Sequence, residues 1–349
     1  MTLSLTTAYD ASASDLPSNT CGDPQPGLRA CSDDTWGDLT EADATRVATA
    51  LAATHAETTR ACYANAWGRW TRWCARRALA PYPAEPSAVC AYLAERAEEG
   101  VSGSSIELVC CAIGHQHREQ GLPNPIDHDA VRRVRKGLRR ILGTAPRRPT
   151  RPLTLGDLRQ IISMIDRTTR QGARDSALVL LGFAGALRRS ELAALTLADL
   201  EHQPEGLVLH LRRSKTDPHG AGQILGVAHG RHPATDPIAA LNSWLTLRGT
   251  APGPLFTSMR PTADAALQPI SGATVSSIVK ERAAGAGLSA ERITAHSLRA
   301  GHATSAAVAG VSVDRIAAQT RHRRIDVLIA RYIQPAQVLQ TTSSRDLGL

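Results

Sequence analysis

Thr-Ala-His-Ser-Leu-Arg-Ala-Gly, residues 294–301, opens a helical segment in the second half of a 349-residue chain. His296 and Arg299 are three positions apart, so a helix brings both side chains to one face. An imidazole and a guanidinium on one face can both donate hydrogen bonds to the oxygens of an anion. Because His-x-x-Arg arises often by chance, the meaning of this pair depends on the rest of the chain.

Two further segments contain residues of the same kinds. Residues 185–192 read Gly-Ala-Leu-Arg-Arg-Ser-Glu-Leu and place Glu191 three positions after Arg188. Residues 320–322 read Thr-Arg-His, and Tyr332 follows ten positions after this histidine. No other tyrosine occurs in the second half of the chain, so this half offers no other tyrosine nucleophile.

A lysine is expected at the tip of a β-hairpin. Leu207-Val-Leu-His-Leu alternates with a period of two, as a half-buried strand does, and residues 223–227 can pair with it. Residues 214–222, between the two strands, have the composition of a turn and contain Lys215. Only three of the 40 basic residues are lysines, so Lys215 has few competitors for a role that needs an ammonium group.

These residue types suit the transesterification of a phosphodiester. Two arginines can clamp the non-bridging oxygens and stabilise the charge that develops in the transition state. A lysine can protonate the leaving group, and a tyrosine can act as a covalent nucleophile. The sequence has no carboxylate cluster typical of a two-metal nuclease, no Cys-x-x-Cys pair and no phosphate-binding GxxxxGK[ST] loop. We therefore expect no metal, nucleotide or other cofactor.

In this order and spacing the four segments resemble the tyrosine recombinase (phage integrase) family, of its simple two-domain, Cre-like type. The resemblance covers residues 153–335. It implies that basic residues surround the scissile phosphate, that Tyr332 is the nucleophile and that Glu191 is an acidic supporting residue. The residues that it assigns to catalysis are Arg188, Lys215, His296, Arg299, His322 and Tyr332.

One spacing departs from the family pattern. In the family nine positions usually separate the histidine or tryptophan of the fourth segment from the tyrosine, whereas His322 and Tyr332 are ten apart. One extra residue rotates an α-helix by about 100°. Three explanations stay open: a loop before the last helix absorbs the residue, His322 is not the aligned donor, or the active site is altered.

Charge and composition divide the chain into five parts. Residues 1–45 contain eight acidic residues and one basic residue, and we expect a disordered acidic tail. Residues 46–145 have helical apolar spacing and resemble, more weakly, the helical (SAM-like) core-binding domain of the family, which binds DNA. Residues 146–153 are expected to form a basic Pro/Arg linker, residues 154–335 the catalytic domain, and residues 336–349 a tail that could dock on a neighbouring subunit.

The expected fold class is therefore mainly α. It combines a helical core-binding domain with a mixed, mostly α catalytic domain that contains a small β-sheet or hairpin, as in the tyrosine recombinase fold.

A basic segment ends the first domain. The net charge of the chain is +8, and nine basic residues with no acidic one lie between Arg132 and Arg151. Such a density exceeds what a solvated helix face needs and indicates contact with nucleic-acid phosphates. The residues expected to bind DNA are Arg132, Arg133, Arg135, Lys136, Arg139, Arg140, Arg147 and Arg148.

The sequence thus predicts a site-specific DNA recombinase or integrase. The resemblance implies cleavage and rejoining through a 3′-phosphotyrosyl intermediate and a Holliday junction, by a homotetramer on two double-stranded recombination sites, without metal or ATP. No membrane segment or secretion signal is evident, so we expect a cytoplasmic protein associated with the bacterial nucleoid. Two alternatives remain: a type IB topoisomerase, and a catalytically impaired, sequence-specific DNA-binding regulator.

Overall fold

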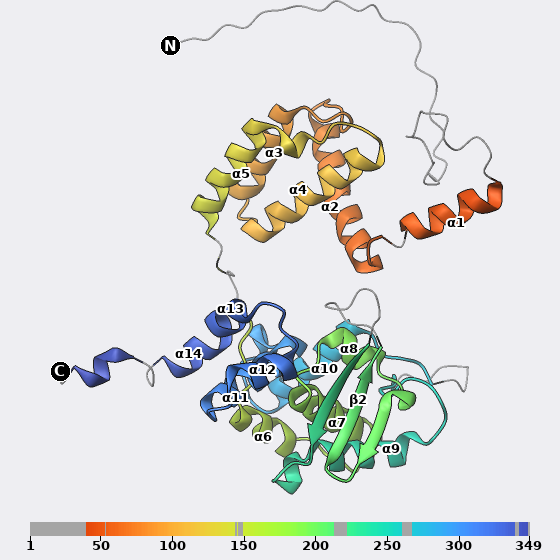
Figure 1. Cartoon of the computed structure of the whole chain (residues 1–349), viewed down its shortest axis with the longest axis vertical. Coiled ribbons are helices and arrows are strands. Elements are labelled where there is room, and N and C mark those ends of the chain that lie inside the picture. Colours follow the sequence, from red (N-terminus) through yellow and green to blue (C-terminus); the bar gives the residue numbers. More distant parts are fainter. Residues whose placement is uncertain are drawn as a thin grey trace, which may run out of the picture. The chain divides into compact units, whose positions relative to one another are not determined.

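The computed structural model divides the chain into two compact units, Met1–Ala145 and Pro146–Leu349, each with its own apolar core (Figure 1). The residues that it describes are 40–52, 54–143, 145, 149–212, 222–259, 267–338 and 342–347. Within these residues, no helix has both the length and the apolar character that crossing a membrane requires.

The first unit is helical throughout its described part. Its elements are α1 (Glu41–Ala52), α2 (Glu57–Arg76), α3 (Pro86–Glu98), α4 (Gly103–Glu119), the short 3₁₀ turn η1 (Pro125–Asp127) and α5 (Asp129–Leu142). Helix α2 packs against α4, and α3 packs against α5. Trp70 and Trp73 stack at a centroid distance of 5.5 Å in the core, and Tyr92 packs against both rings. These buried aromatic side chains join α2 to α3 in the core of the unit.

Helix α1 begins inside the segment predicted to be a disordered tail. The backbone N–H of Asp43 donates to Thr40 Oγ1 (3.2 Å), and the backbone N–H of Thr40 donates to Asp43 Oδ2 (3.1 Å). This reciprocal cap satisfies N–H groups at the start of the helix, so the prediction of disorder was wrong for residues 41–45. Residues 1–39 lie outside the described part.

The second unit is mostly helical, with one small sheet. Its elements are α6 (Leu155–Ser163), α7 (Arg170–Ala184), α8 (Arg189–Ala194), η2 (Leu197–Asp199), β1 (Leu200–Gln203), β2 (Gly206–Leu211), β3 (Gln223–Ala228), η3 (Pro233–Thr235), α9 (Pro237–Arg248), α10 (Gly272–Gly285), η4 (Ala290–Arg292), α11 (Ala295–Val308), α12 (Val313–Thr320), α13 (Ile325–Leu328), the π-helical turn η5 (Ile329–Ile333), α14 (Gln334–Gln337) and η6 (Ser343–Asp346). The mainly α fold class with a small sheet is confirmed.

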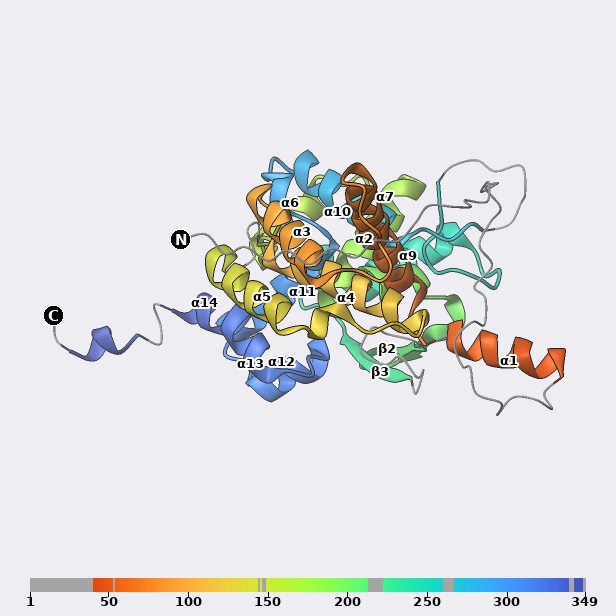
Figure 2. The ribbon, with the colours of Figure 1, turned by 90° about the horizontal axis from the view of Figure 1, so that it is seen from above.

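The sheet is antiparallel, in the order β1-β2-β3, and Figure 2 shows β2 and β3 side by side. Leu207 pairs with Val227 and Leu209 with Leu225, and all four side chains are buried against α7 and α9. The predicted hairpin is confirmed, whereas β1 is an additional short strand whose mostly exposed residues give no alternating pattern. Lys215, predicted at the hairpin tip, lies outside the described residues.

Helix α11 carries the 294–301 stretch and passes very close to the start of the second unit. A Cβ atom at Gly301 would lie 1.9 Å from the carbonyl oxygen of Leu153, so a larger residue does not fit without displacing that segment. The N–H of Leu153 donates to the carbonyl of Ser297 (3.1 Å), and its side chain is fully buried. These contacts fix the first turns of α11 against the core.

Two predicted boundaries differ from the structure. Leu153, assigned to the linker, is a core residue, because a proline-rich stretch predicts extended backbone but not what that backbone packs against. At the other end, α14 crosses the boundary predicted before residue 336. Ala336 packs against the small cluster around Leu328 and Ile333, and Gln337 Nε2 donates to the carbonyl of Ala307 (2.7 Å), so both residues belong to the second unit.

Candidate active site

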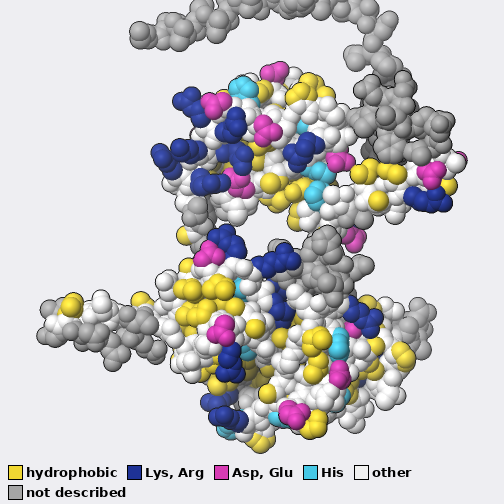
Figure 3. Space-filling view, viewed as in Figure 1, with side chains coloured by type: hydrophobic (Ala, Val, Ile, Leu, Met, Phe, Trp, Pro, Cys, Tyr) yellow, Lys and Arg dark blue, Asp and Glu magenta, His cyan; other side chains and the backbone are white. Residues whose placement is uncertain are grey.

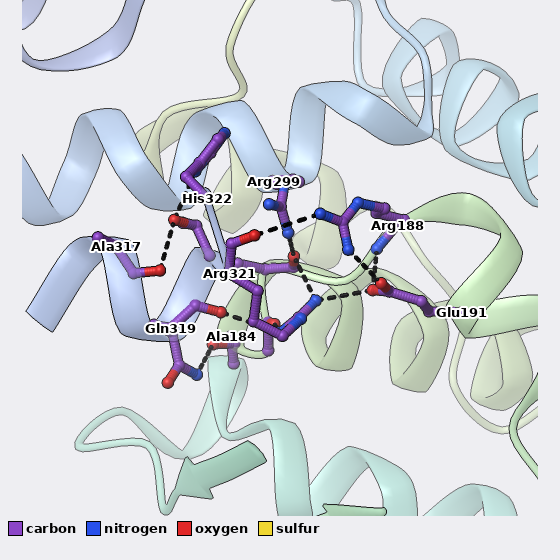
Figure 4. Close-up of polar contacts among 11 residues, drawn as sticks. Ala184, Arg188, Glu191, Arg299, Ala317, Gln319, Arg321 and His322 are labelled. Carbon is purple, nitrogen blue, oxygen red and sulfur yellow. Dashed lines mark hydrogen bonds and ion pairs between the residues drawn. The ribbon is translucent and has the colours of Figure 1, made fainter. Parts of the chain in front are cut away.

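A buried carboxylate, Glu191 on α8, is contacted by two arginines, Arg188 and Arg321 (Figure 4). Its side chain is 1% exposed. Oε1 accepts a hydrogen bond from Arg188 Nη1 (2.5 Å), and Oε2 accepts from the Arg188 backbone N–H (2.8 Å) and from Arg321 Nη2 (2.7 Å). Burial opposes ionisation, but the charges and hydrogen bonds of the two arginines outweigh it and hold the pKa of Glu191 below its usual value. The group is therefore an anion at neutral pH.

A third arginine lies beside Arg188 and Arg321. Arg299, on α11, is 3% exposed, and its Nη1 donates to the carbonyl of Ala186 (2.7 Å), which also accepts from Arg321 Nη2 (3.3 Å). Burial and the charges of Arg188 and Arg321 lower the pKa of Arg299 to about 9, so it stays protonated at neutral pH. We call Arg188, Arg299 and Arg321 the arginine cluster. Three positively charged side chains lie there with a single carboxylate, so the site has a net positive charge that favours the binding of a further anion.

The hydroxyl of Tyr332 meets an imidazole. Its oxygen lies 2.9 Å from His296 Nε2, which α11 presents one helical turn before Arg299. Although part of the His296 side chain is exposed, the atoms packed around it exclude water and disfavour its charged form. This desolvation, together with the positive charges of Arg299, Arg188 and Arg331, lowers the pKa of His296. Burial raises the pKa of Tyr332, although Arg299 and Arg331 oppose this. At neutral pH the pair is therefore a neutral imidazole beside a protonated phenol.

His322 also lies in this cluster, next to Tyr332. Its ring centroid lies 5.7 Å from that of Tyr332, and burial together with Arg299, Arg188, His296 and Arg321 lowers its pKa to about 4. Its Nδ1 lies 2.7 Å from Thr320 Oγ1, whose proton is directed to the carbonyl of Ile316 (2.6 Å). Nδ1 is then the donor, so Nε2 is unprotonated in the neutral ring and becomes a donor only when His322 is protonated.

The π-helical turn that contains Tyr332 offers an explanation for the extra residue between His322 and Tyr332. The turn η5 contains Tyr332 and is π-helical, and the Gln334 N–H donates to the carbonyl of Ile329, five residues earlier. A π-turn holds one residue more per hydrogen-bonded ring than an α-helix, so it absorbs a single insertion without rotating the next helical turn. This explanation was not among the three considered from the sequence.

Five of the six residues assigned to catalysis by resemblance therefore lie together, and the sixth, Lys215, is outside the described residues. Sequence reasoning missed Arg321. Its place next to His322 was visible, but nothing in the spacing indicated that its side chain would reach Glu191. No three His, Cys, Asp or Glu side chains gather closely enough to hold a metal ion within the described part of the chain.

The residues predicted to bind DNA divide into two groups on α5 in the first unit. Figure 3 shows basic side chains gathered along this helix. Arg132, Arg133, Lys136 and Arg140 are exposed and make no hydrogen bond or ion pair within the described residues. Arg135 and Arg139 instead pair with Glu107 of α4 at 2.5 and 3.1 Å, and Arg135 is only 25% exposed. Arg147 and Arg148 lie outside the described residues.

Comparison with known proteins identifies the family. Residues 151–338 match the phage integrase family. An integrase/recombinase xerD homolog of Selenomonas ruminantium is 30% identical over 288 residues, which cover 82% of this chain and 84% of that protein.

The chain belongs to the phage integrase family.

This recombinase also resembles the recombinase cre of Escherichia phage P1, at 27% identity over 189 residues, 53% of each chain. A lambda integrase dimer bound to a COC′ core site superposes with a TM-score of 0.58 at 19% identity, over 83% of this chain and 75% of that one. XerH recombinase bound to a difH substrate gives 0.56 at 14% identity, over 75% and 73%. The predicted tyrosine recombinase fold is confirmed.

Family membership also confirms the predicted enzyme class, a site-specific recombinase that acts on DNA by transesterification. The topoisomerase and the DNA-binding regulator are not favoured by these relatives.

Deleting Ala330, an exposed residue of the π-turn, tests the explanation of the ten-residue spacing. We expect the turn to become α-helical while α13 and α14 keep their places, so Tyr332 stays beside His296. Covalent protein–DNA adduct formation should then remain within about tenfold of wild type, because the reacting groups stay in place.

Deleting Ala318, an exposed residue of the regular helix α12, is the matched control. It should rotate His322 by about 100° and abolish cleavage. Equal losses in both deletions would contradict the explanation.

Proposed function

We propose that Tyr332 of this recombinase attacks a DNA phosphodiester held by Arg188 and Arg299. The Tyr332 oxygen forms a bond to phosphorus while the bond from phosphorus to the 5′ oxygen breaks, leaving a 3′-phosphotyrosyl link and a 5′-hydroxyl. The 2.9 Å contact between Tyr332 and His296, beside the arginine cluster, is the observation that supports this most directly. It supports the proposal because a phenol and a neutral imidazole, the groups that a covalent nucleophile and its proton acceptor require, lie next to several guanidinium groups.

The 2.9 Å contact gives the Tyr332 proton an acceptor, and the two pKa shifts describe the protonation state of each group before attack. The pKa of Tyr332 is raised, mainly by burial, so the phenol does not ionise by itself at neutral pH. The pKa of His296 is lowered, which keeps its imidazole neutral and able to accept the phenolic proton through Nε2. We propose His296 as this acceptor.

The arginine cluster supplies the electrostatic part of catalysis. Attack on phosphorus adds negative charge to the non-bridging oxygens, and guanidinium groups can donate two parallel hydrogen bonds to them. Because Glu191 neutralises one of the three cations, the site keeps net positive charge for the phosphate. Bound phosphate is itself an anion beside His322, so its charge makes protonation of that histidine easier, which would convert Nε2 into a further donor.

Lys215 is proposed to protonate the 5′ oxygen as it leaves. Support comes from the hairpin that flanks it, since Gln319 Nε2 donates both to Gly226 on β3 (3.0 Å) and to Ala184 at the end of α7 (3.1 Å). These bonds tie the hairpin to the elements that carry Arg188 and His322.

Strand exchange requires the reaction to run backwards on a different 5′-hydroxyl. We propose that a homotetramer does this on two double-stranded recombination sites through a Holliday junction, with the C-terminal tail docking on a neighbouring subunit. A lambda integrase tetramer bound to a Holliday junction has a related fold, with a TM-score of 0.55 at 18% identity. Such a substrate would keep the protein at the nucleoid in the bacterial cytoplasm. We further propose that α5 contacts phosphates of the same DNA through its unpaired basic side chains.

The nucleophile is tested with a nicked duplex whose short 5′ fragment diffuses away after cleavage and traps the covalent intermediate. Wild type should give a protein–DNA adduct resistant to denaturant, and Tyr332→Phe should give none, because no other tyrosine occurs in this half of the chain. Tyr82→Phe, which changes a tyrosine of the first unit, serves as the control and should keep adduct formation. Adduct formation by Tyr332→Phe would overturn the proposal.

The DNA contact of α5 is tested by comparing two neighbouring residues. Lys136→Gln should weaken binding to all DNA sequences and reduce the slope of log Kd against log salt by about 0.9, the value for one lost phosphate contact. Arg135→Gln removes the same charge from a side chain already paired with Glu107, and it should leave the slope nearly unchanged. Equal slopes for Lys136→Gln and wild type would exclude α5 as a phosphate contact.

A further inference from the structure

Arg321 occupies a backbone conformation that arginine rarely adopts. It follows α12 with φ 53° and ψ 45°, in the left-handed region. Its N–H donates to the carbonyl of Ala318 and the N–H of His322 donates to that of Ala317, both at 3.2 Å. This pair of bonds is the Schellman ending of a helix, in which the left-handed residue is usually glycine because a Cβ atom is strained there. The chain thus carries a large side chain where a glycine would fit with less strain.

The Arg321 side chain is 7% exposed, contacts two other segments and also returns to its own helix end. Nη2 donates to Glu191 Oε2 (2.7 Å) and to the carbonyl of Ala186 (3.3 Å). Nη1 donates to the carbonyls of Gln319 (2.9 Å) and Gly185 (3.3 Å). Figure 4 shows this guanidinium between Gln319 and Glu191. Arg321 therefore links the end of α12, the turn after α7 and the buried carboxylate of α8.

Both arginines proposed to hold the phosphate depend on the groups that Arg321 holds. Arg188 shares Glu191 with it, and Arg188 Nη2 lies 3.4 Å from the Arg321 carbonyl. Arg299 shares the carbonyl of Ala186 with it. Ala186 itself has a left-handed backbone with φ 45°, so its carbonyl direction is a local arrangement that needs support. A guanidinium can span carboxylate and carbonyls together because its donors form a rigid planar fork, which an ammonium lacks.

We propose that Arg321 is a positioning residue of this recombinase: it orients Arg188 and Arg299 toward the scissile phosphate by holding Glu191 and the turn at Ala186. The proposal deepens the proposed function and rests on it. Arg321 itself does not touch the DNA. Its loss should therefore slow strand cleavage at saturating DNA much more than it weakens DNA binding.

Two substitutions separate this role from a structural one. Arg321→Gly removes the side chain and relieves the left-handed strain, whereas Arg321→Ala removes the side chain and keeps the strain. The glycine variant should therefore have the higher melting temperature. Both should nevertheless form the covalent adduct about 10- to 100-fold more slowly than wild type, with a Kd for DNA within about twofold, because a misplaced catalytic group costs this much in rate. A glycine variant that cleaves within twofold of wild type would overturn the proposal.

A conservative variant separates geometry from charge. Arg321→Lys keeps a cation next to Glu191 but cannot bridge the carboxylate and the carbonyls. It should recover less than a tenth of the lost rate, if the fork positions the neighbouring arginines. Full recovery by lysine would show that charge alone is needed and would refute a positioning role.

A measurement that does not require DNA cleavage tests the positioning role of Arg321 separately from the proposed function. The ¹⁵N relaxation of the Arg188 Nε–Hε group, measured in the full chain without DNA, reports how firmly its guanidinium is held. In Arg321→Gly that group should become mobile on the picosecond-to-nanosecond timescale, whereas in wild type it should be rigid. An equally rigid Arg188 would refute the positioning role, even if wild type cleaves DNA. If wild type forms no adduct while Arg188 loses its order in the variant, the proposed function fails and the positioning role stands.

Discussion

The site depends on one buried ion-pair network, in which the Glu191 carboxylate holds Arg188 from the adjacent turn and Arg321 from a segment 130 residues away. Buried charges are costly to desolvate, and breaking such a pair by removing one partner destabilises proteins by about 3–5 kcal/mol. Here the network leaves an excess of positive charge beside a tyrosine hydroxyl. Stability of the folded unit and affinity for a phosphate are therefore linked through the same carboxylate.

The fold brings these distant segments together by close backbone contact. Gly301 lets α11 pass directly against Leu153, which fixes the helix that carries His296 and Arg299. The left-handed residue at the end of α12 reverses the chain and turns His322 toward the same place. The π-turn then brings Tyr332 to His296. Each contact involves only a few residues, and together they define one small region on the second unit.

Much of the fold and of the site was predictable from the sequence, because the patterns that indicate them span only a few residues each. The spacing of His296 and Arg299 on one helical face and the alternation of residues 207–211 follow from simple periodicity. Family resemblance then selected the residues that the structure brings together, apart from Lys215, which lies outside the described part. Family and fold were predicted correctly because four motifs in a fixed order are far more specific than any one of them.

The remaining features depend on tertiary contacts that no local pattern encodes. Nothing in the sequence distinguished Arg321 from the other arginines, because its buried partners are distant in sequence. The π-turn could not be predicted, since an inserted residue can be absorbed in a loop or in a helix with the same composition. Leu153 looked like part of a linker because its burial depends on α11, more than 140 residues later.

Replacing Glu191 by glutamine tests the central claim most directly, because it keeps the side-chain shape, removes the charge and replaces one acceptor oxygen by an NH2 donor. We predict that Glu191→Gln forms the covalent DNA adduct about 100-fold more slowly, because both guanidinium groups lose the ion pair and the amide oxygen cannot accept from both as the carboxylate does. DNA binding should stay as tight as in wild type or become tighter, since a negative charge has been removed near the phosphate site. A Glu191→Gln protein that is folded and cleaves DNA at the wild-type rate would contradict the claim that this carboxylate organises the site.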